Sequence, residues 1–308
     1  MSYPTFEDAQ ATVRAFEALL EEHGLAIQSG TKAGAEALAM GDLLEMWRTP
    51  ALRPDDPRDV VRAALGFVDL AGKVVAVRDH PDFAQLIPHL QMLSQTSVLQ
   101  NAHSPITDQA GNKVIELYMA CLAMYAASNV ELDHPVTSSG GRNPDVMFDF
   151  RNKKWALALK TLNGKAPRTL FENIKKAADQ IEASAADHGL VVINLKNVLD
   201  HVGLWPAPDE SYLEADVMSL LNFQVFSIIG MLDEISAEEW SQIIGGGRKA
   251  QYPILFVGQT ATSVFSTHGQ GGYFTALKPM VAHPEPVPDT LGAMKLARLL
   301  SDRMQQFQ

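Results

Sequence analysis

The feature that most constrains the fold is the order of apolar segments within residues 107–197. One nearly continuous apolar stretch, KVIELYMACLAMYAA, is longer than an ordinary strand and predicts a helix. Three shorter runs follow, NVELDHPV, PDVMFDF and KWALALKTL, and turn-forming residues separate them, as is typical of strands. A helical pattern over 167–186 and the apolar run LVVINLKN complete the segment. The order helix, strand, strand, strand, helix, strand predicts an α/β core over residues 106–206.

The regions on either side of this core are expected to be mainly helical. Residues 1–105 carry apolar side chains at three- and four-residue spacing, beginning with Phe6 after a candidate N-cap at Thr5 or Ser2. Residues 207–308 predict a long apolar helix over 211–244, broken near Gly230, a single strand over 253–258, and a last helix from about residue 290. The uncharged stretch 217–232 is too short and too polar for a bilayer span, so it predicts a buried helix. We expect the last helix to be available for a partner subunit, which would make the chain a homo-oligomer.

Charge is unevenly distributed along the chain. The net charge of −11 argues against a protein that coats nucleic acid or an anionic membrane with its whole surface. Residues 141–182 nevertheless contain nine basic and five acidic residues, a local excess of +4. This excess fits a confined site for a polyanion, although solvated charges on a helix and a hairpin would give the same count.

The number of cysteines and the N-terminal residues indicate the cellular compartment of the protein. Cys121 is the single cysteine, so the chain has no internal disulfide, and no Cys/His cluster offers a zinc site. The acidic start MSYPTFEDAQ lacks the basic and apolar regions of a secretory signal. These features predict a cytoplasmic protein without a membrane partner.

The two strands PDVMFDF and KWALALKTL predict a hairpin with distinct faces. A two-residue turn at Asn152-Lys153 would place Asp145 directly opposite Lys160, on a polar face with small alanines that leave it open. The other face would carry the large apolar side chains and would form the core. A turn of odd length would reverse these faces, so the register is a prediction.

Glu116 is the one acidic residue in the apolar helix. A buried carboxylate must be paired, hydrogen-bonded or bound to a metal ion, and the simpler alternative is that Glu116 lies on a narrow solvent-facing stripe. In the helix predicted over 167–186, the polar residues Asn173, Lys176 and Gln180 share one face by their spacing.

Four residues in this order resemble the PD-(D/E)xK nuclease superfamily. They are Glu116 on a helix, Asp145 of the Pro144-Asp145 pair at a strand start, Lys160 on the next strand and Gln180 on the following helix. The resemblance covers about a third of the chain. It implies a restriction-endonuclease-like core, in which helices flank a central mixed sheet, with helical N-terminal and mostly helical C-terminal extensions.

The resemblance also implies a metal-dependent nuclease that hydrolyses phosphodiester bonds, with DNA the expected polymer. Asp145 and Glu116 would hold Mg²⁺ or Mn²⁺, and Lys160, supported by Gln180, would orient or help to deprotonate the attacking water. Backbone phosphates would be contacted by four basic residues, Lys165, Arg168, Lys175 and Lys176.

The chain departs from the family pattern at Ala158, which stands where the family has its second acid. Three explanations remain open. A carboxylate from Glu116, Asp149 or Glu172 substitutes for the missing ligand; or the protein is a catalytically silent relative that binds nucleic acid or protein; or an original acid has been replaced by alanine.

Overall fold

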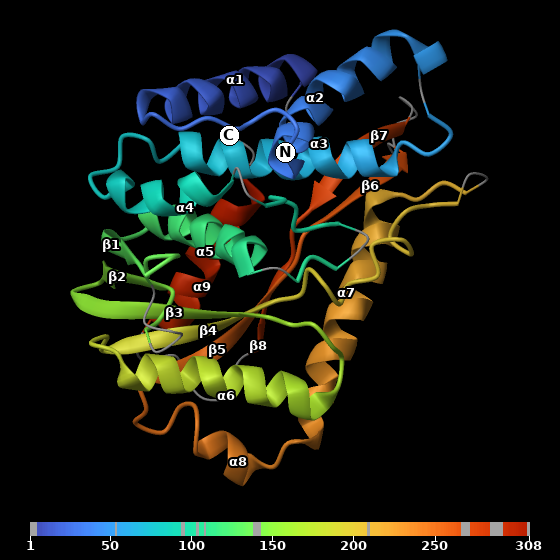
Figure 1. Cartoon of the computed structure of the whole chain (residues 1–308). Helices are drawn as coiled ribbons and strands as arrows, with labels where there is room; N and C mark the ends of the chain where they lie inside the picture. Colours follow the sequence, from blue (N-terminus) through green and yellow to red (C-terminus); the bar gives the residue numbers. More distant parts are fainter. Residues whose placement is uncertain are drawn as a thin grey trace.

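The protein is built around a six-stranded mixed sheet with the strand order β1-β2-β3-β4-β5-β8 (Figure 1). The computed structural model describes residues 5–52, 54–93, 96–102, 105–107, 109–137, 143–207, 210–265, 272–283 and 292–306. The strands of the sheet are β1 (Ser128–Leu132), β2 (Val146–Phe150), β3 (Lys153–Thr161), β4 (His188–Asn194), β5 (Ala250–Val257) and β8 (Met280–His283). Strands β3, β4 and β5 are parallel to one another, and the remaining pairings are antiparallel. The predicted α/β class, with a mixed sheet flanked by helices, is confirmed.

Helices cover both faces of the sheet, with α5 on one side and α6 on the other (Figure 1). The helices are α1 (Phe6–Glu22), α2 (Lys32–Arg48), α3 (Arg58–Val75), α4 (Ile87–Met92), α5 (Gln109–Met124), α6 (Pro167–Ala183), α7 (Glu214–Gly230), α8 (Ala237–Ser241) and α9 (Ala293–Gln305), with short 3-10 turns η1 (Pro50–Leu52), η2 (Phe83–Leu86) and η4 (Met231–Glu234). One apolar core lies between the sheet and α5, α9 and the N-terminal helices, and a second lies between the sheet, α6 and α7.

Local sequence signals explain where the first helix begins and ends. The Thr5 hydroxyl accepts a hydrogen bond from the Asp8 amide, and the Asp8 carboxylate accepts one from the Thr5 amide. Gly24 follows the helix with a φ of +69°, a conformation that glycine adopts without steric cost. The helix predicted from Phe6 is therefore confirmed, together with its N-cap.

The β2–β3 hairpin has a different register from the one predicted. Its turn is formed by Arg151 and Asn152, both with positive φ, so that Met147 pairs with Ala156 and Asp149 pairs with Lys154. The predicted register is wrong by two residues. Because two is even, the side chains keep their predicted faces.

The expectation that the polar face of this hairpin is open is also wrong. Helix α6 packs on that face, and Ala156 and Ala158 are fully buried beneath it. The small alanine side chains allow this close approach of helix and sheet.

The C-terminal region contains more strands than predicted. Besides β5, residues 207–308 contribute β8 to the central sheet and the separate two-stranded ribbon of β6 (Thr260–Phe265) and β7 (Gly272–Leu277). The expectation of a single strand is wrong because TATSVF and GYFTAL, rich in β-branched and aromatic residues, pair with each other as strands. The last helix, α9, buries its apolar side in the protein's own core, where Leu296 and Leu300 are fully buried, so this side does not face a partner subunit.

Candidate active site

Helix α5 places Glu116 inside the protein, with 6% of its surface exposed. Lys113, one turn earlier on the same helix, donates a hydrogen bond from Nζ to Glu116 Oε2 at 2.8 Å. His89 Nε2, on α4, lies 3.3 Å from the same oxygen. Glu116 is therefore buried and paired, and the alternative of a solvent-facing stripe is wrong.

Asp145 lies immediately before β2 and is 8% exposed. Its amide donates to the Leu157 carbonyl at 3.0 Å, which fixes its position against β3. The carboxylate turns back toward β3, and its Oδ2 accepts a hydrogen bond from the Leu159 amide at 2.6 Å. Two backbone contacts with one strand thus hold this carboxylate in place.

Lys160 reaches the same region from the far part of β3. Its ammonium donates to Oε1 of Gln180, which is buried on α6. Gln180 in turn donates from Nε2 to the Asn143 carbonyl at 2.9 Å, two residues before Asp145. Gln180 therefore links the lysine of β3 to the segment that carries the aspartate.

Burial and mutual repulsion shift the pKa values of the acidic groups. Burial, reinforced by the negative charge of Glu116, raises the pKa of Asp145 to about 7, although Lys160 partly offsets this effect. Burial also raises the pKa of Glu116, against the opposing effect of Lys113. Two neighbouring carboxyl groups that both resist ionisation form a site that favours a shared proton or a bound cation.

Burial shifts the basic groups in the opposite direction. It lowers the pKa of Lys160, and the nearby carboxylates Asp145 and Glu116 only partly offset it. It also lowers the pKa of His89 to about 4, and the positive charge of Lys113 acts in the same direction. His89 is therefore neutral at pH 7, while Lys160 gives up its proton more readily than an exposed lysine.

The structure separates the other candidate acids from this cluster. Asp149 accepts a hydrogen bond from Asn129 Nδ2 at 2.7 Å, and Glu172 forms an ion pair with Arg168 at 3.1 Å. Of the three candidates for replacing the missing acid, only Glu116 lies beside Asp145. Ala158 is fully buried between β3 and α6 and provides no polar atom beyond its backbone.

The four predicted phosphate contacts all lie at the surface, on α6 and the loop before it. Arg168 is engaged in ion pairs, with Glu239 at 2.6 Å and Glu172 at 3.1 Å. Lys176 lies one helical turn before Gln180, and its charge acts on Lys160. Lys176 is therefore the surface cation most closely associated with the cluster, and Lys165 and Lys175 are exposed in the same region.

Two members of the cluster, Lys113 and His89, were not predicted. The three-residue spacing from Lys113 to Glu116 places both on one side of a helix, which is a signal that the sequence does contain. His89 is 27 positions from Glu116, and no local pattern connects the two residues.

The donor set suits a hard divalent cation held mainly by oxygen. Among the described residues, no group of three or more His, Cys, Asp or Glu side chains has a metal-binding arrangement. Asp145 and Glu116 nevertheless form a buried pair of carboxyls, and a cation such as Mg²⁺ retains several waters and needs few protein ligands. The residues present therefore fit a two-carboxylate site.

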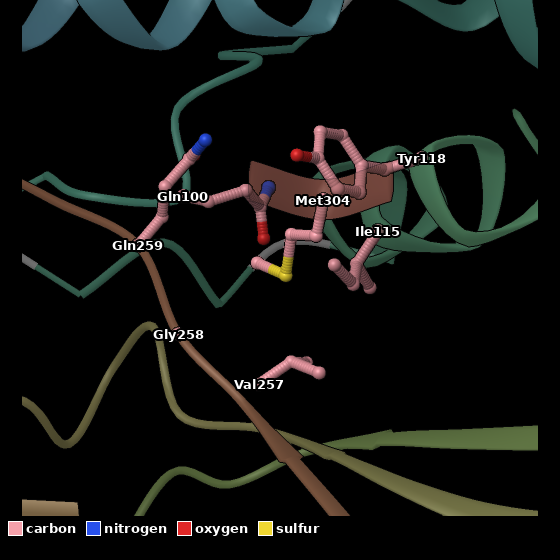
Figure 2. Close-up of a pocket in the computed structure, with 7 residues that line it drawn as sticks. All are labelled: Gln100, Ile115, Tyr118, Val257, Gly258, Gln259 and Met304. Carbon is pink, nitrogen blue, oxygen red and sulfur yellow. The ribbon is translucent and has the colours of Figure 1, made fainter. Parts of the chain in front are cut away.

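A separate small pocket lies between α5, α9 and the end of β5 (Figure 2). It is lined by Gln100, Ile115, Tyr118, Val257, Gly258, Gln259 and Met304. The lining lacks a carboxylate and an ammonium group, so the pocket is a weaker candidate for hydrolytic chemistry than the Asp145 cluster.

Comparisons with protein-family models, curated proteins and solved structures found no match to this chain. The function is therefore inferred from the chemistry of the residues themselves.

Proposed function

We propose that the protein is a metal-dependent nuclease that hydrolyses phosphodiester bonds, with DNA as its polymer and a restriction-endonuclease-like core. The observation that carries this proposal is the grouping of Glu116, Asp145 and Lys160, which come from three different elements, in one buried cluster. Burial of two carboxyls beside a half-buried lysine is costly, and such perturbed groups concentrate at functional sites.

Each residue of the Asp145 cluster would have a separate role in the proposed reaction. Asp145 and Glu116 would hold Mg²⁺ or Mn²⁺, which when bound supplies Lewis-acid polarisation of a phosphoryl oxygen. Lys160, whose pKa is lowered by burial, would stabilise negative charge on the phosphate or accept a proton from water. Gln180 orients the Lys160 ammonium, and Lys113 and His89 hold the Glu116 carboxylate.

The surface around the cluster supports an anionic substrate. Lys176, Lys175 and Lys165 are exposed on α6 and the loop before it, where they would contact backbone phosphates without reading bases. Because the protein as a whole is acidic, this local cation group would confine the polymer to the vicinity of the cluster.

The test is cleavage of plasmid and single-stranded DNA with Mg²⁺ or Mn²⁺. We expect Asp145→Asn and Lys160→Met to lower the cleavage rate by roughly 100-fold or more, the scale of a lost transition-state contact. Asp149→Asn is the matched control because Asp149 lies on β2, the strand that begins just after Asp145, but outside the cluster. Absence of cleavage by the wild-type protein with every metal and both substrates would refute the proposal.

A second candidate, a catalytically silent module that binds nucleic acid or protein, is favoured by the charge balance of the cluster. Lys113 and Lys160 already provide two ammonium groups for the two carboxyls, and Ala158 on the neighbouring strand β3 contributes no acid. Under this alternative the protein binds DNA without cutting it, and Asp145→Asn leaves the affinity unchanged.

Ala158→Glu distinguishes an altered nuclease from a silent relative. If an acid originally stood at this position, the variant gains cleavage and its melting temperature rises on addition of Mg²⁺. If the site is silent, the variant only loses stability, because a larger charged side chain is forced beneath α6.

A further inference from the structure

Helix α7 has two apolar sides, of which only one is covered. Val217, Leu221 and Val225 are fully buried in the core beside α6, as the sequence predicted for this helix. On the opposite side Phe223 is 72% exposed and Phe226 is 57% exposed. The prediction of a buried helix is thus right for one side and wrong for the other.

Five exposed large apolar side chains lie on α7 and beside its start, and they are here called the α7 stripe. It consists of Leu213, Leu220, Phe223, Phe226 and Phe265. Phe265, at the end of β6, bridges to Leu213 just before α7, so it extends the stripe beyond the helix. Figure 1 shows α7 at one margin of the molecule, between the β6–β7 ribbon and α8.

The shape of this surface suits a second helix. Leu220, Phe223 and Phe226 follow one another at three-residue spacing, which aligns them along one side of α7. Ser219, Ser227 and Gly230 on the same helix are also exposed. Because these residues are small, they leave gaps into which side chains of another helix can pack. A contiguous exposed patch of large apolar residues is typical of an interaction site.

The surrounding charge indicates which kind of helix fits. Residues 197–247 contain nine Asp and Glu residues and neither Lys nor Arg. Glu214 and Asp216 lie at the start of α7, and Asp233 and Glu234 lie just beyond its end in η4. The stripe is therefore apolar along its length and acidic at both ends.

We propose that the α7 stripe binds an amphipathic helix of a partner protein, with apolar anchors at helical spacing and Lys or Arg residues at both ends. Apolar contacts with Phe223 and Phe226 would supply the affinity, and opposite charges at the ends would set the position and orientation. The proposal is independent of the nuclease activity.

The same charges disfavour the other occupants. A second copy of α7, packed parallel or antiparallel, would place acidic ends against acidic ends. The helical residues 214–234 are long and apolar enough to cross a bilayer by length and composition, so the expectation that 217–232 is too short and too polar for a span is wrong on that criterion. A third of the apolar window is buried inside the protein. An anionic membrane surface would also be repelled by the acidic residues.

The test uses two fluorescent helical peptides of 17 residues, the length of α7. Both carry the same leucine stripe; one has lysines at both ends and the other has glutamates. By fluorescence anisotropy we expect the lysine peptide to bind the full-length protein at least about tenfold more tightly. The double variant Phe223→Ser, Phe226→Ser should weaken this binding about tenfold or more.

Two further variants separate the contributions of the stripe and of its ends. Asp233→Asn with Glu234→Gln should reduce the preference for the lysine peptide. Leu38→Ser is the matched control because Leu38 is 64% exposed on α2, away from the stripe, and it should leave binding unchanged. Circular dichroism checks that each variant is folded.

Several outcomes would overturn the proposal. One is equal binding of the two peptides, and another is no binding of either peptide. A dimer in sedimentation equilibrium that the double variant abolishes would assign the stripe to a second copy of the chain. Flotation with phosphatidylserine vesicles that the double variant abolishes would assign it to a membrane.

Discussion

Two buried clusters of charged residues, one around Asp69 and one around Asp145, show how differently a protein can accommodate an acidic group. The Lys278 ammonium lies 2.7 Å from Asp69 Oδ1, and both side chains are 1% exposed. Tyr118 donates from its hydroxyl to Asp69 Oδ2 at 2.8 Å, and Gln259 donates to the same oxygen. Each oxygen of Asp69 thus has a donor.

The Asp145 cluster balances its charges less directly: Lys113 pairs with Glu116, whereas no ion pair joins Lys160 to Asp145 among the described contacts. Asp145 receives one backbone hydrogen bond at Oδ2 and lies beside a second carboxyl, so its pKa rises to about 7. Lys160, the nearest candidate for a counter-ion, donates to an amide oxygen instead. Burial alone therefore does not mark a site: the satisfied charge of Asp69 holds elements together, whereas raised pKa values of two adjacent acids are typical of functional sites.

The position of Asp69 explains its structural role. Asp69 belongs to α3 and Tyr118 to α5, whereas Gln259 and Lys278 follow β5 and β7. One carboxylate therefore joins two of the helices to two C-terminal loops that are distant in the sequence. Such a tie constrains the N-terminal helices relative to the sheet.

The largest expected change in the free energy of unfolding comes from breaking the ion pair between Lys278 and Asp69. Lys278→Met leaves the Asp69 carboxylate buried without its counter-ion, so we expect a loss of about 3–5 kcal/mol in the free energy of unfolding, measured by urea denaturation. Replacing Asp69 by Leu in the same protein should recover part of this loss. A change below about 1 kcal/mol in the single variant would show that the pair is not a structural tie.

The next effect is a dependence of stability on pH at the Asp145 cluster. A carboxyl whose pKa is higher in the folded than in the unfolded protein binds more protons when folded, so its contribution to stability is present at low pH. That contribution is lost as the pH rises from about 4 through the folded pKa of about 7. The slope for one such group is at most about 1.4 kcal/mol per pH unit.

Asp145→Asn isolates this effect because it removes the titrating group but keeps the shape of the side chain. We expect the difference in unfolding free energy between wild type and variant to shift in favour of the variant between pH 4 and pH 7. If the unfolding free energies of wild type and variant changed with pH in the same way, the pKa of Asp145 would not be raised by folding. The contrast with Asp69 would then disappear.

The smallest effect concerns Gln180, which connects Lys160 to the Asn143 carbonyl. Gln180→Leu removes both hydrogen bonds and should cost about 1–2 kcal/mol in urea denaturation. If Gln180 positions Lys160, the variant should also reduce cleavage in the presence of Mg²⁺. A loss of stability with unchanged cleavage would limit Gln180 to a structural role.

Some parts of the site could be predicted because they depend on local pattern. The strand faces of the β2–β3 hairpin followed from the two-residue period of side chains, and an even error in register did not disturb them. The position of Glu116 within an otherwise apolar helix indicated either a buried carboxylate that needs partners or a narrow solvent-facing stripe, and the structure shows the first, with Lys113 and His89 as partners.

Other parts could not be predicted because they depend on distant contacts or on turn geometry. The turn at Arg151-Asn152 requires positive φ at an arginine, which composition does not favour. The pairing of β5 with β4 joins residues 188–194 to a strand more than fifty positions away, and the pairing of β8 with β5 places a further C-terminal strand beside it. Short apolar runs do not indicate which strand they will join.

The amino-acid pattern alone determined the order of elements over residues 107–197, the faces of the β2–β3 hairpin and the acidic character of residues 197–247, because these depend on side-chain period and composition. The tertiary structure decided that α6 covers Ala158, that His89 reaches Glu116 and that one side of α7 stays exposed. The physical reason is that the side-chain pattern of a helix or strand shows only which of its sides is apolar. What covers that side is decided when all the layers pack together.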